Sequence, residues 1–346
     1  MEEKKPYLIA ILFQTITAGM FIMSKGALNE GMNSFVFIFY RQMAGAIFLI
    51  AAVIFKRESP MPLSFVAFCK IFLLSLVGIT LGLNVYGVAL NYTSSSLAAA
   101  INNCLQPTTF FLAIFLRMER LKLRTIGGVA KVVGIMLCMS GVVTLALYEG
   151  PHLKPIIHHH LLDNSQESKD HSSADQNWIK GCFLMFLSTI CWALLHVYQA
   201  PVMKDCPSRL IFTSLLCLSS AIQTGAVAIA VERDLSQWKL GWDIKLVAVI
   251  SCAFMTSAVS ANLMAWLIEK KGPVFHAMWT PLCLIITILF STFLLGEVIS
   301  LGSVMGGILL VGSLYCVLWG KSKEDGEMLK KLNNQDRSKA ETEQHC

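Results

Sequence analysis

The stretch NNCLQPTTFFLAIFL (102–116) has a counterpart in HAMWTPLCLIITILF (276–290), which is reached by adding 174 to each residue number. Both stretches open with polar or aromatic residues, place a proline at the sixth position and continue as an apolar run. Inside a helix, a proline removes one hydrogen bond and frees the carbonyl four residues earlier, here those of Asn103 and Ala277. The two stretches therefore predict equivalent broken helices in two copies of one repeat.

Apolar runs of about 20 residues recur on both sides of these stretches, and each is long enough to cross about 30 Å of hydrocarbon as a helix. The chain of 346 residues has a mean hydropathy of +0.61 and only 14% charged residues, against about 25% in soluble domains. In lipid every backbone amide needs an internal partner, so these runs predict helices. We expect ten spans, at residues 7–25, 34–55, 69–90, 97–116, 126–147, 179–198, 209–231, 245–268, 274–295 and 301–320.

One long polar segment divides these spans into five and five. Because five is odd, the second set enters the membrane from the opposite face, which is the inverted-repeat arrangement common among secondary transporters. The predicted fold class is an all-α membrane protein of ten transmembrane helices in two inverted five-helix repeats. We expect an amino-terminal tail at 1–6, the first repeat at 7–147, a polar linker outside the cytoplasm at 148–178, the second repeat at 179–320 and a disordered tail at 321–346.

Positive charge is distributed unequally between the two faces that this topology defines. Of the 28 Lys and Arg residues, 19 fall in segments on the side of both tails and seven in segments on the other side. By the positive-inside rule, both tails are expected in the cytoplasm. The net charge of +6 therefore reflects topology, and no basic stripe interleaved with aromatic residues predicts nucleic-acid binding.

An ordered set of short stretches across the chain resembles a known family. The set runs through Gly19-Met20, Gly31-Met32, Tyr40-Arg41, Arg117-Met118-Glu119, Gly272-Pro273 and Trp319-Gly320-Lys321. It is similar to the plant nodulin-21-like group of transporters, also called the UMAMIT or Walls-Are-Thin-related group, in the EamA branch of the drug/metabolite transporter superfamily. The resemblance implies a ten-helix fold that moves amino acids or related small metabolites, including auxin in some relatives. It also implies a location in the plasma membrane, with the vacuolar membrane as the alternative.

Polar residues beside the two prolines are the first candidates for a substrate pathway. Polar groups at membrane depth are costly, so they tend to face a cavity or another helix. Within each stretch the two matched polar positions lie four residues apart and share one helical face. The alternative is that the prolines only shape the helices while the polar groups bond to neighbours. The predicted pathway residues here are Asn102, Asn103, Gln106, Pro107, His276, Trp279, Thr280 and Pro281.

A second group of candidates lies in other spans. Asn84 and Asn262 form a matched pair after a four-residue shift, and hydrogen bonding between helices is an equal alternative for them. Gln14, Trp192 and His196 lie on the helices that open each repeat. A zwitterionic amino acid needs donors for its carboxylate, which Asn, Gln and Thr supply, and carbonyls or ring faces for its ammonium.

Four charged residues are candidates for gates or membrane anchors. Arg41 lies inside a span and could attract an anionic substrate, although snorkelling to the outer headgroups is the preferred interpretation. Lys131 lies about one turn inside its span, where it could pair with Glu119 at the cytoplasmic edge. Glu119 and Glu297 end matched spans on opposite faces, and a plain interfacial carboxylate is the preferred interpretation of each.

The distribution of titratable groups bears on energy coupling and on other functions. None of the 22 acidic residues lies at mid-membrane, whereas proton pumps commonly use buried carboxylates. A passive facilitator is therefore at least as plausible as a proton-driven exporter. His196 and His276 could carry a proton, but neutral, hydrogen-bonded histidines are preferred. No metal-binding or nucleophilic arrangement predicts an enzyme, a metal site or a cofactor, and the expected partners are a small solute and the lipid bilayer.

Overall fold

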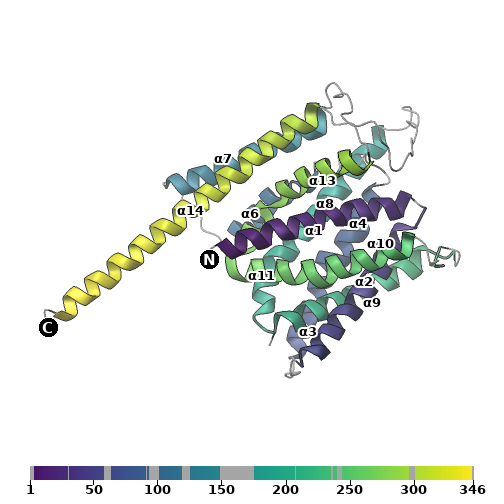
Figure 1. Ribbon diagram of the computed structural model, residues 1–346, viewed down its shortest axis with the longest axis horizontal. Helices are drawn as coiled ribbons and strands as arrows, with labels where there is room; N and C mark the ends of the chain where they lie inside the picture. Colours follow the sequence, from purple (N-terminus) through teal and green to yellow (C-terminus); the bar gives the residue numbers. More distant parts are fainter. Residues whose placement is uncertain are drawn as a thin grey trace.

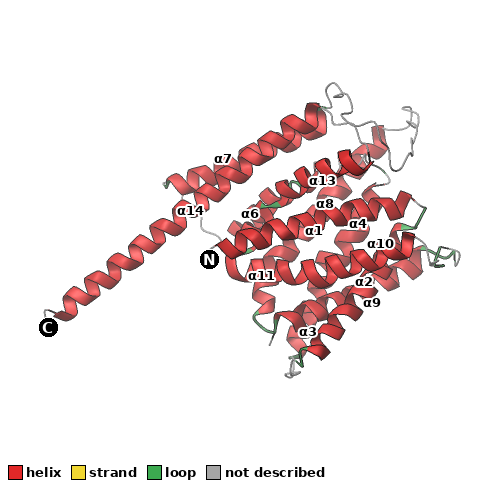
Figure 2. Cartoon of the chain, in the orientation of Figure 1, coloured by secondary structure: helices red, strands yellow, loops and turns green. Residues whose placement is uncertain are grey.

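The computed structural model describes residues 4–29, 31–57, 64–90, 92, 101–118, 125–148, 175–206, 208–234, 237–239, 244–295 and 301–344. Across this described part, the regular secondary structure is entirely helical (Figures 1 and 2). Glu119 and Glu297, the two predicted gate carboxylates, lie outside it, as does most of the predicted linker.

The first half of the chain forms a helical bundle in the order that the apolar runs predict. Its elements are α1 (Lys5–Asn29), α2 (Ser34–Phe55), α3 (Phe65–Ser75), the π-helix η2 (Leu76–Leu81), α4 (Gly82–Leu90), α6 (Leu105–Phe115) and α7 (Ile126–Leu147). Continuous helix from α3 through η2 to α4 makes one long segment, which begins four residues before the predicted third span.

The second half repeats this order. Its elements are α8 (Asp175–Met203), α9 (Arg209–Val231), α10 (Ile244–Cys252), the π-helix η3 (Ala253–Ser260), α11 (Ala261–Lys271), α12 (Pro273–Met278), α13 (Thr280–Leu295) and α14 (Leu301–Gln344). Helix α8 starts at Asp175, inside the segment predicted to be linker.

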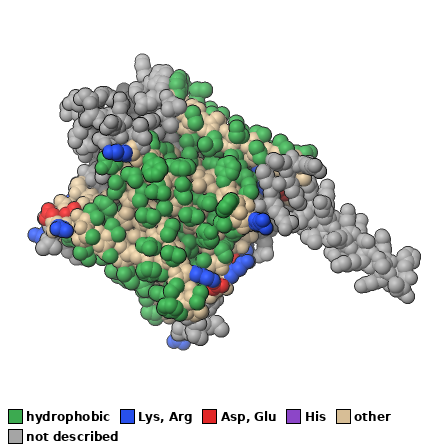
Figure 3. Space-filling view, turned by 180° about the vertical axis from the view of Figure 1, so that it is seen from behind, with side chains coloured by type: hydrophobic (Ala, Val, Ile, Leu, Met, Phe, Trp, Pro, Cys, Tyr) green, Lys and Arg blue, Asp and Glu red, His purple; other side chains and the backbone are tan. Residues whose placement is uncertain are grey.

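Most of these elements belong to helical segments that could cross a membrane. Seven helical segments in the described ranges are long and apolar enough to cross a membrane, and two shorter apolar helices cover Leu105–Phe115 and Lys245–Met255. Figure 3 shows a broad apolar band across one face, with charged side chains gathered at its edges. The protein is thus a multi-pass membrane protein, and the full count of ten spans stays a prediction.

The two halves pack as equivalent partners. Helix α7 packs along α14 and α2 along α9, so the fifth and second helices of one half each pair with their counterparts in the other (Figure 1). Several further contacts occur in matched pairs: α1 packs on α13 as α8 packs on α6, and α1 packs on α10, η3 and α11 as α8 packs on η2 and α4. This exchange symmetry is what a pseudo-twofold axis between two inverted repeats produces.

Glycines allow the close approach of α7 and α14. Gly127, Gly134 and Gly141 recur every seven residues on α7, facing Gly320, Val317 and Gly306 on α14. A Cβ atom added to Gly127 would lie 2.7 Å from the carbonyl oxygen of Gly320. Small residues at such positions let helix backbones approach closely in membranes.

The end of α14 differs from the sequence-based expectation. Residues 321–346 were predicted to be disordered from their charge, whereas α14 continues as a helix to Gln344 and projects beyond the rest of the bundle (Figure 1). This segment contains five Lys, four Glu and two Gln. These residues have high intrinsic helix propensity, which the mean-charge argument did not weigh.

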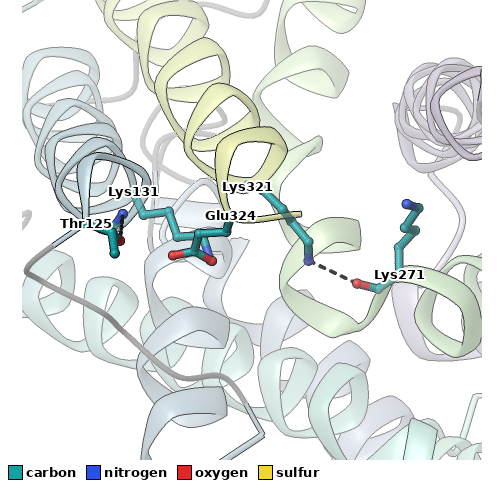
Figure 4. Close-up of polar contacts among 6 residues, drawn as sticks. Thr125, Lys131, Lys271, Lys321 and Glu324 are labelled. Atoms are coloured by element: carbon teal, nitrogen blue, oxygen red, sulfur yellow. Dashed lines mark hydrogen bonds and ion pairs between the residues drawn. The ribbon is translucent and has the colours of Figure 1, made fainter. Parts of the chain in front are cut away.

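The end of the bundle that carries Lys5 is closed by ion pairs and hydrogen bonds. We call it the amino-terminal end, and the opposite end, where α7 ends and α8 begins, the linker end. At the amino-terminal end Lys70 pairs with Asp205, with 2.7 Å between Nζ and Oδ2, and Arg209 pairs with Glu269 at 2.8 Å. Figure 4 shows α14 attached on two sides here, through Glu324 to Lys131 of α7 and through Lys321 to the Lys271 carbonyl that ends α11.

Candidate functional site

A cavity of about 260 Å³ lies between the two halves. Its wall is formed by α1, α2, η2, α4 and α6 with Asn102 from the first half, and by α8, α9, η3, α11, α12 and α13 from the second. The lining extends toward the linker end, where Ser24 and Ser34 belong to it. Toward the amino-terminal end, apolar clusters around Phe275 and Phe212 fill the interior. The cavity is therefore closed at the amino-terminal end.

Six of the predicted pathway residues line this cavity. They come from both repeats, and all six are among the candidates next to the prolines or on the helices that open each repeat. They are Gln14, Asn102, Trp192, His196, His276 and Thr280. The structure therefore brings together the two halves of the predicted pathway at one place.

The other candidates next to Pro107 do not reach the cavity. A turn at Asn103 and Cys104 separates Asn102 from α6, so the helical spacing of four residues does not place Gln106 on the same face. Instead, Gln106 Nε2 donates to Ser313 Oγ of α14 at 3.3 Å. The Asn103 carbonyl, predicted to be a free ligand, accepts a hydrogen bond from the Cys138 thiol at 3.6 Å.

In the second half, the carbonyl freed by Pro281 and the Trp279 ring also have partners inside the protein. The Ala277 carbonyl, which Pro281 leaves without its usual helical partner, accepts a hydrogen bond from Thr280 Oγ1 at 2.7 Å. Trp279 turns away from the cavity and packs against Tyr7 and Phe275, with 6.2 Å between ring centroids in each case. The freed carbonyls and Trp279 thus have partners inside the protein, and their residues are not among those that line the cavity.

Asn84 and Asn262 satisfy their polar groups within the bundle. Asn84 Nδ2 donates to the Thr80 carbonyl at 2.7 Å, and Asn262 Oδ1 accepts from Thr213 Oγ1 at 3.1 Å. Neither asparagine lines the cavity. The predicted alternative, hydrogen bonding between helices, holds for Asn262 of α11 with Thr213 of α9, whereas Asn84 bonds within its own helical segment.

Arg41 lies on the cavity wall and does not snorkel. Its side chain is 7% exposed. Its guanidinium lies 3.7 Å from Met20 Sδ and 6.0 Å from the Phe37 ring centroid, and its Nε has no hydrogen-bond partner among the residues that the structure describes. The preferred interpretation of Arg41 as a headgroup anchor is thus wrong. Helix α2 starts at Ser34, so Arg41 lies two turns inside it and faces the interior.

His196 and His276 meet at the wall. Their ring centroids are 4.7 Å apart at an interplanar angle of 87°, and Phe13 packs on His276 from α1, also with 4.7 Å between centroids. Trp192 lies one turn from His196 on α8, with 6.3 Å between centroids. Gly272, at φ +90°, ends α11 and allows the sharp turn into Pro273 that directs α12 and its histidine inward.

Lys131 of α7 pairs with a glutamate of α14. Its ammonium nitrogen lies 2.5 Å from Glu324 Oε2, and its side chain is 1% exposed. Glu119, the partner predicted from sequence, is outside the described residues. The pairing with α14 was not predicted because residues from Lys321 onward were treated as a tail.

Several wall residues were not predicted from sequence. Phe21 and Ser24 line the cavity on the same helix as Gln14 and Thr17, which were candidates from sequence. Their spacing of three or four residues from one another follows the face of α1 that carries Gln14, so helical periodicity could have found them. Among the described lining residues, none is Asp or Glu, and Arg41 carries the one permanent charge.

Comparisons with known proteins identify the class to which this fold and cavity belong. Residues 4–147 and 179–319 each match the EamA-like transporter family. The chain therefore belongs to the EamA-like transporter family, and its two halves are duplicated domains of that family.

Within the family, the chain is similar to WAT1-related proteins of Arabidopsis thaliana. It is 53% identical to WAT1-related protein At5g64700 over 331 residues, covering 94% of this chain and 92% of the relative. It is 41% identical to WAT1-related protein At1g43650, covering 94% of each. A crystal structure of a protein superposes with a TM-score of 0.65 at 15% identity, covering 92% of this chain and 96% of that one, which shows a shared fold alone.

Proposed function

We propose that this membrane transporter moves small organic solutes that carry a carboxylate, amino acids or related metabolites, by alternating access between its two repeats. The observation that carries the proposal is the cavity wall, which presents the guanidinium of Arg41 and, among described residues, no opposing carboxylate. A desolvated guanidinium favours carboxylates strongly. The volume of about 260 Å³ lies just below the range of about 300–1,000 Å³ typical of sites for drug-sized ligands, which suits a smaller solute.

The composition of the wall also supports a second candidate, an organic acid without an ammonium group, such as auxin. No described carboxylate is present to pair with an ammonium, so a zwitterion would depend on ring faces and neutral acceptors. Phe13, Phe21, Phe37 and Trp192 on the wall offer packing for an apolar or aromatic body. Both candidates share the carboxylate that Arg41 would hold.

The membrane arrangement proposed with this function places the amino-terminal end at the cytoplasm. The support is the excess of Lys and Arg in the segments on that side. The cavity would then be reached from outside the cytoplasm in the conformation described here. The plasma membrane is the proposed location, with the vacuolar membrane as the alternative, and either facilitated diffusion or export is compatible with this geometry.

A matched set of three radiolabelled solutes tests the proposal in proteoliposomes. Phenylalanine has a carboxylate and an ammonium, phenylacetate has only the carboxylate, and phenethylamine has only the ammonium. We expect uptake of at least one of the first two and no uptake of phenethylamine. Transport of phenethylamine alone would overturn the proposal.

Variants of Arg41 connect this selectivity to the cavity. Loss of a charge-assisted hydrogen bond of about 1.5–3 kcal/mol corresponds to roughly a tenfold to hundredfold weaker apparent affinity. We expect that loss for Arg41→Gln, partial retention for Arg41→Lys, and wild-type transport for the control Arg233→Gln, since Arg233 is exposed and does not line the cavity. Equal affinities in Arg41→Gln and wild type would show that the guanidinium does not hold the solute.

A further inference from the structure

The two histidines on the cavity wall are buried and in contact with each other. His196 is 3% and His276 4% exposed, and their rings meet edge to face, with 4.7 Å between centroids. The Nδ1 atom of each ring has no hydrogen-bond partner in the described part of the chain. Buried polar atoms are nearly always paired in native proteins, so two adjacent exceptions in a cavity call for an explanation.

The charges around this pair determine how it can titrate. The other titratable groups on the wall are Arg41 on α2, Tyr86 on α4, Cys217 on α9 and Cys283 on α13. The lining residues of α1, α6, η2, η3 and α11 include none. A proton on the histidine pair therefore has no described carboxylate on the wall to balance its charge.

Several charged groups off the wall have partners at the amino-terminal end. Of the elements packed on α8 and α12, α3 carries Lys70, which pairs with Asp205, and α11 carries Glu269, which pairs with Arg209. On α14, Lys321 donates to the Lys271 carbonyl. These contacts lie at the closed amino-terminal end, so they leave the balance of charge inside the cavity to Arg41, the histidines and the solute.

Protonation of the histidine pair is unfavourable while no anion is bound in the cavity, and a bound anion makes it favourable. Arg41 already contributes one positive charge, and a second positive charge in a poorly solvated space is unfavourable. Two imidazoles at this distance also repel if both are charged, so the pair is limited to one shared proton. A solute carboxylate would cancel the charge of Arg41 and make the imidazolium form favourable.

We propose that His196 and His276 form a single proton site that is filled when a carboxylate solute occupies the cavity, so that solute and proton bind together. This inference rests on the proposed function, since the carboxylate supplies the coupling. Linkage is reciprocal: if the solute favours the proton, the proton favours the solute by the same factor. Affinity for the solute should therefore fall as pH rises.

Calorimetry of the purified full-length protein in detergent tests this directly. The probe is whichever of phenylalanine and phenylacetate binds more tightly, titrated at pH 6, 7 and 8 in two buffers with different ionisation enthalpies. The difference in heat between buffers gives the number of protons taken up. In the wild type we expect uptake approaching one proton per solute and a dissociation constant that rises with pH, by up to tenfold per pH unit.

Glutamine variants separate a proton site from simple packing. His196→Gln and His276→Gln keep a polar amide but cannot titrate in this range. Each single variant is expected to reduce proton uptake, and the double variant to abolish it and make the dissociation constant independent of pH. The control Arg233→Gln should match the wild type. Retained proton uptake in a folded double variant would overturn the inference.

The outcomes also distinguish this inference from the proposed function. Binding of the probe by the wild type without proton uptake would overturn the proton site and leave the carboxylate transporter intact. Failure of the wild type to bind either probe would overturn both. Because each histidine is tested separately, misfolding of one variant leaves the other to decide.

Discussion

Lys131 of α7 and Glu324 of α14 form an ion pair in which the ammonium nitrogen lies 2.5 Å from a carboxylate oxygen. The lysine side chain is 1% exposed, whereas the glutamate is 20% exposed. The lysine thus depends on the protein for solvation, while the glutamate also reaches water. Next to the pair, Gly320 lies against the carbonyl of Gly127, so charge and close packing join the same two helices.

This asymmetry predicts unequal effects of removing each partner. Glu324→Gln weakens the solvation of a buried ammonium and should lower the free energy of unfolding by about 2 kcal/mol. Lys131→Met should cost less, because the remaining carboxylate is partly hydrated. Thermal unfolding in detergent measures both. As a control, Asp205→Asn breaks a pair whose side chains are 50% and 40% exposed and should change little. Equal melting temperatures for Glu324→Gln and wild type would contradict the prediction.

The packing of α7 on α14 predicts a strong contrast between two glycines of α14. A Cβ atom at Gly320 would lie 2.6 Å from the Gly127 carbonyl oxygen, a backbone atom that cannot rotate away. Gly320→Ala should therefore destabilise the protein by about 1–3 kcal/mol. At Gly307 no atom of the described residues lies within 4 Å of an added Cβ, so Gly307→Ala should be neutral or stabilising. Chemical or thermal unfolding compares the two, and equal stability would mean that the helices are not in close contact.

The order of the helices could be predicted from the sequence because long apolar segments in lipid have few alternatives to a transmembrane helix. The internal match between residues 102–116 and 276–290 led to two repeats, and the family comparison confirms the duplication. What the sequence could not show was where long helices are interrupted. The π-helices η2 and η3 lie at matching places in the two halves, yet neither contains a proline or a charge that would mark it.

The two matched polar pairs had opposite outcomes at the two helix breaks. His276 and Thr280 both line the cavity although a turn at Trp279 separates α12 from α13, whereas the turn at residues 103–104 sends Asn102 and Gln106 in different directions. Arg41 was assigned to the headgroups because depth along a helix can be read from sequence but rotation toward a cavity cannot. That rotation depends on which neighbouring helices pack on α2, here α9 and η3.

Gln223 of α9 was not predicted, and its contacts indicate that it supports η2. Its Oε1 accepts from Thr80 Oγ1 at 2.8 Å and from Ser75 Oγ at 3.3 Å, and its Nε2 donates to the Phe72 carbonyl at 3.0 Å. These partners lie in the turn before the π-helix and within it, where the usual backbone pattern is shifted. Gln223 therefore satisfies groups that the interruption exposes.

Replacing Gln223 should loosen this segment. Gln223→Leu removes three hydrogen bonds inside the bundle and is expected to cost about 1 kcal/mol for each. Hydrogen exchange measured by mass spectrometry should increase in residues 72–84, and the melting temperature should fall. Gln237→Leu changes an exposed glutamine and serves as the control. Unchanged exchange in residues 72–84 would show that η2 holds its shape without Gln223.

Lys321 leads to a prediction about how the closed end opens. Its Nζ donates to the Lys271 carbonyl at 3.1 Å and lies 5.7 Å from the Phe275 ring centroid. It thereby connects α14 to the junction at Gly272, which carries α12 and its wall residue His276. Alternating access requires this end to separate when the other end closes. A contact that bridges α14 and the α11–α12 junction should therefore hold the amino-terminal end shut.

Lys321→Met should make the amino-terminal end open more readily. Loss of a hydrogen bond worth about 1 kcal/mol corresponds to roughly fivefold faster exchange of amides that are protected only in the closed form. Hydrogen exchange across residues 268–280 measures this effect. Lys323→Met is the matched control, because Lys323 contacts only the Trp319 ring of its own helix among the contacts resolved for it, with 5.5 Å to the centroid. If both variants exchange at the wild-type rate, α14 does not restrain this junction, and closure depends on the apolar cluster around Phe275 alone.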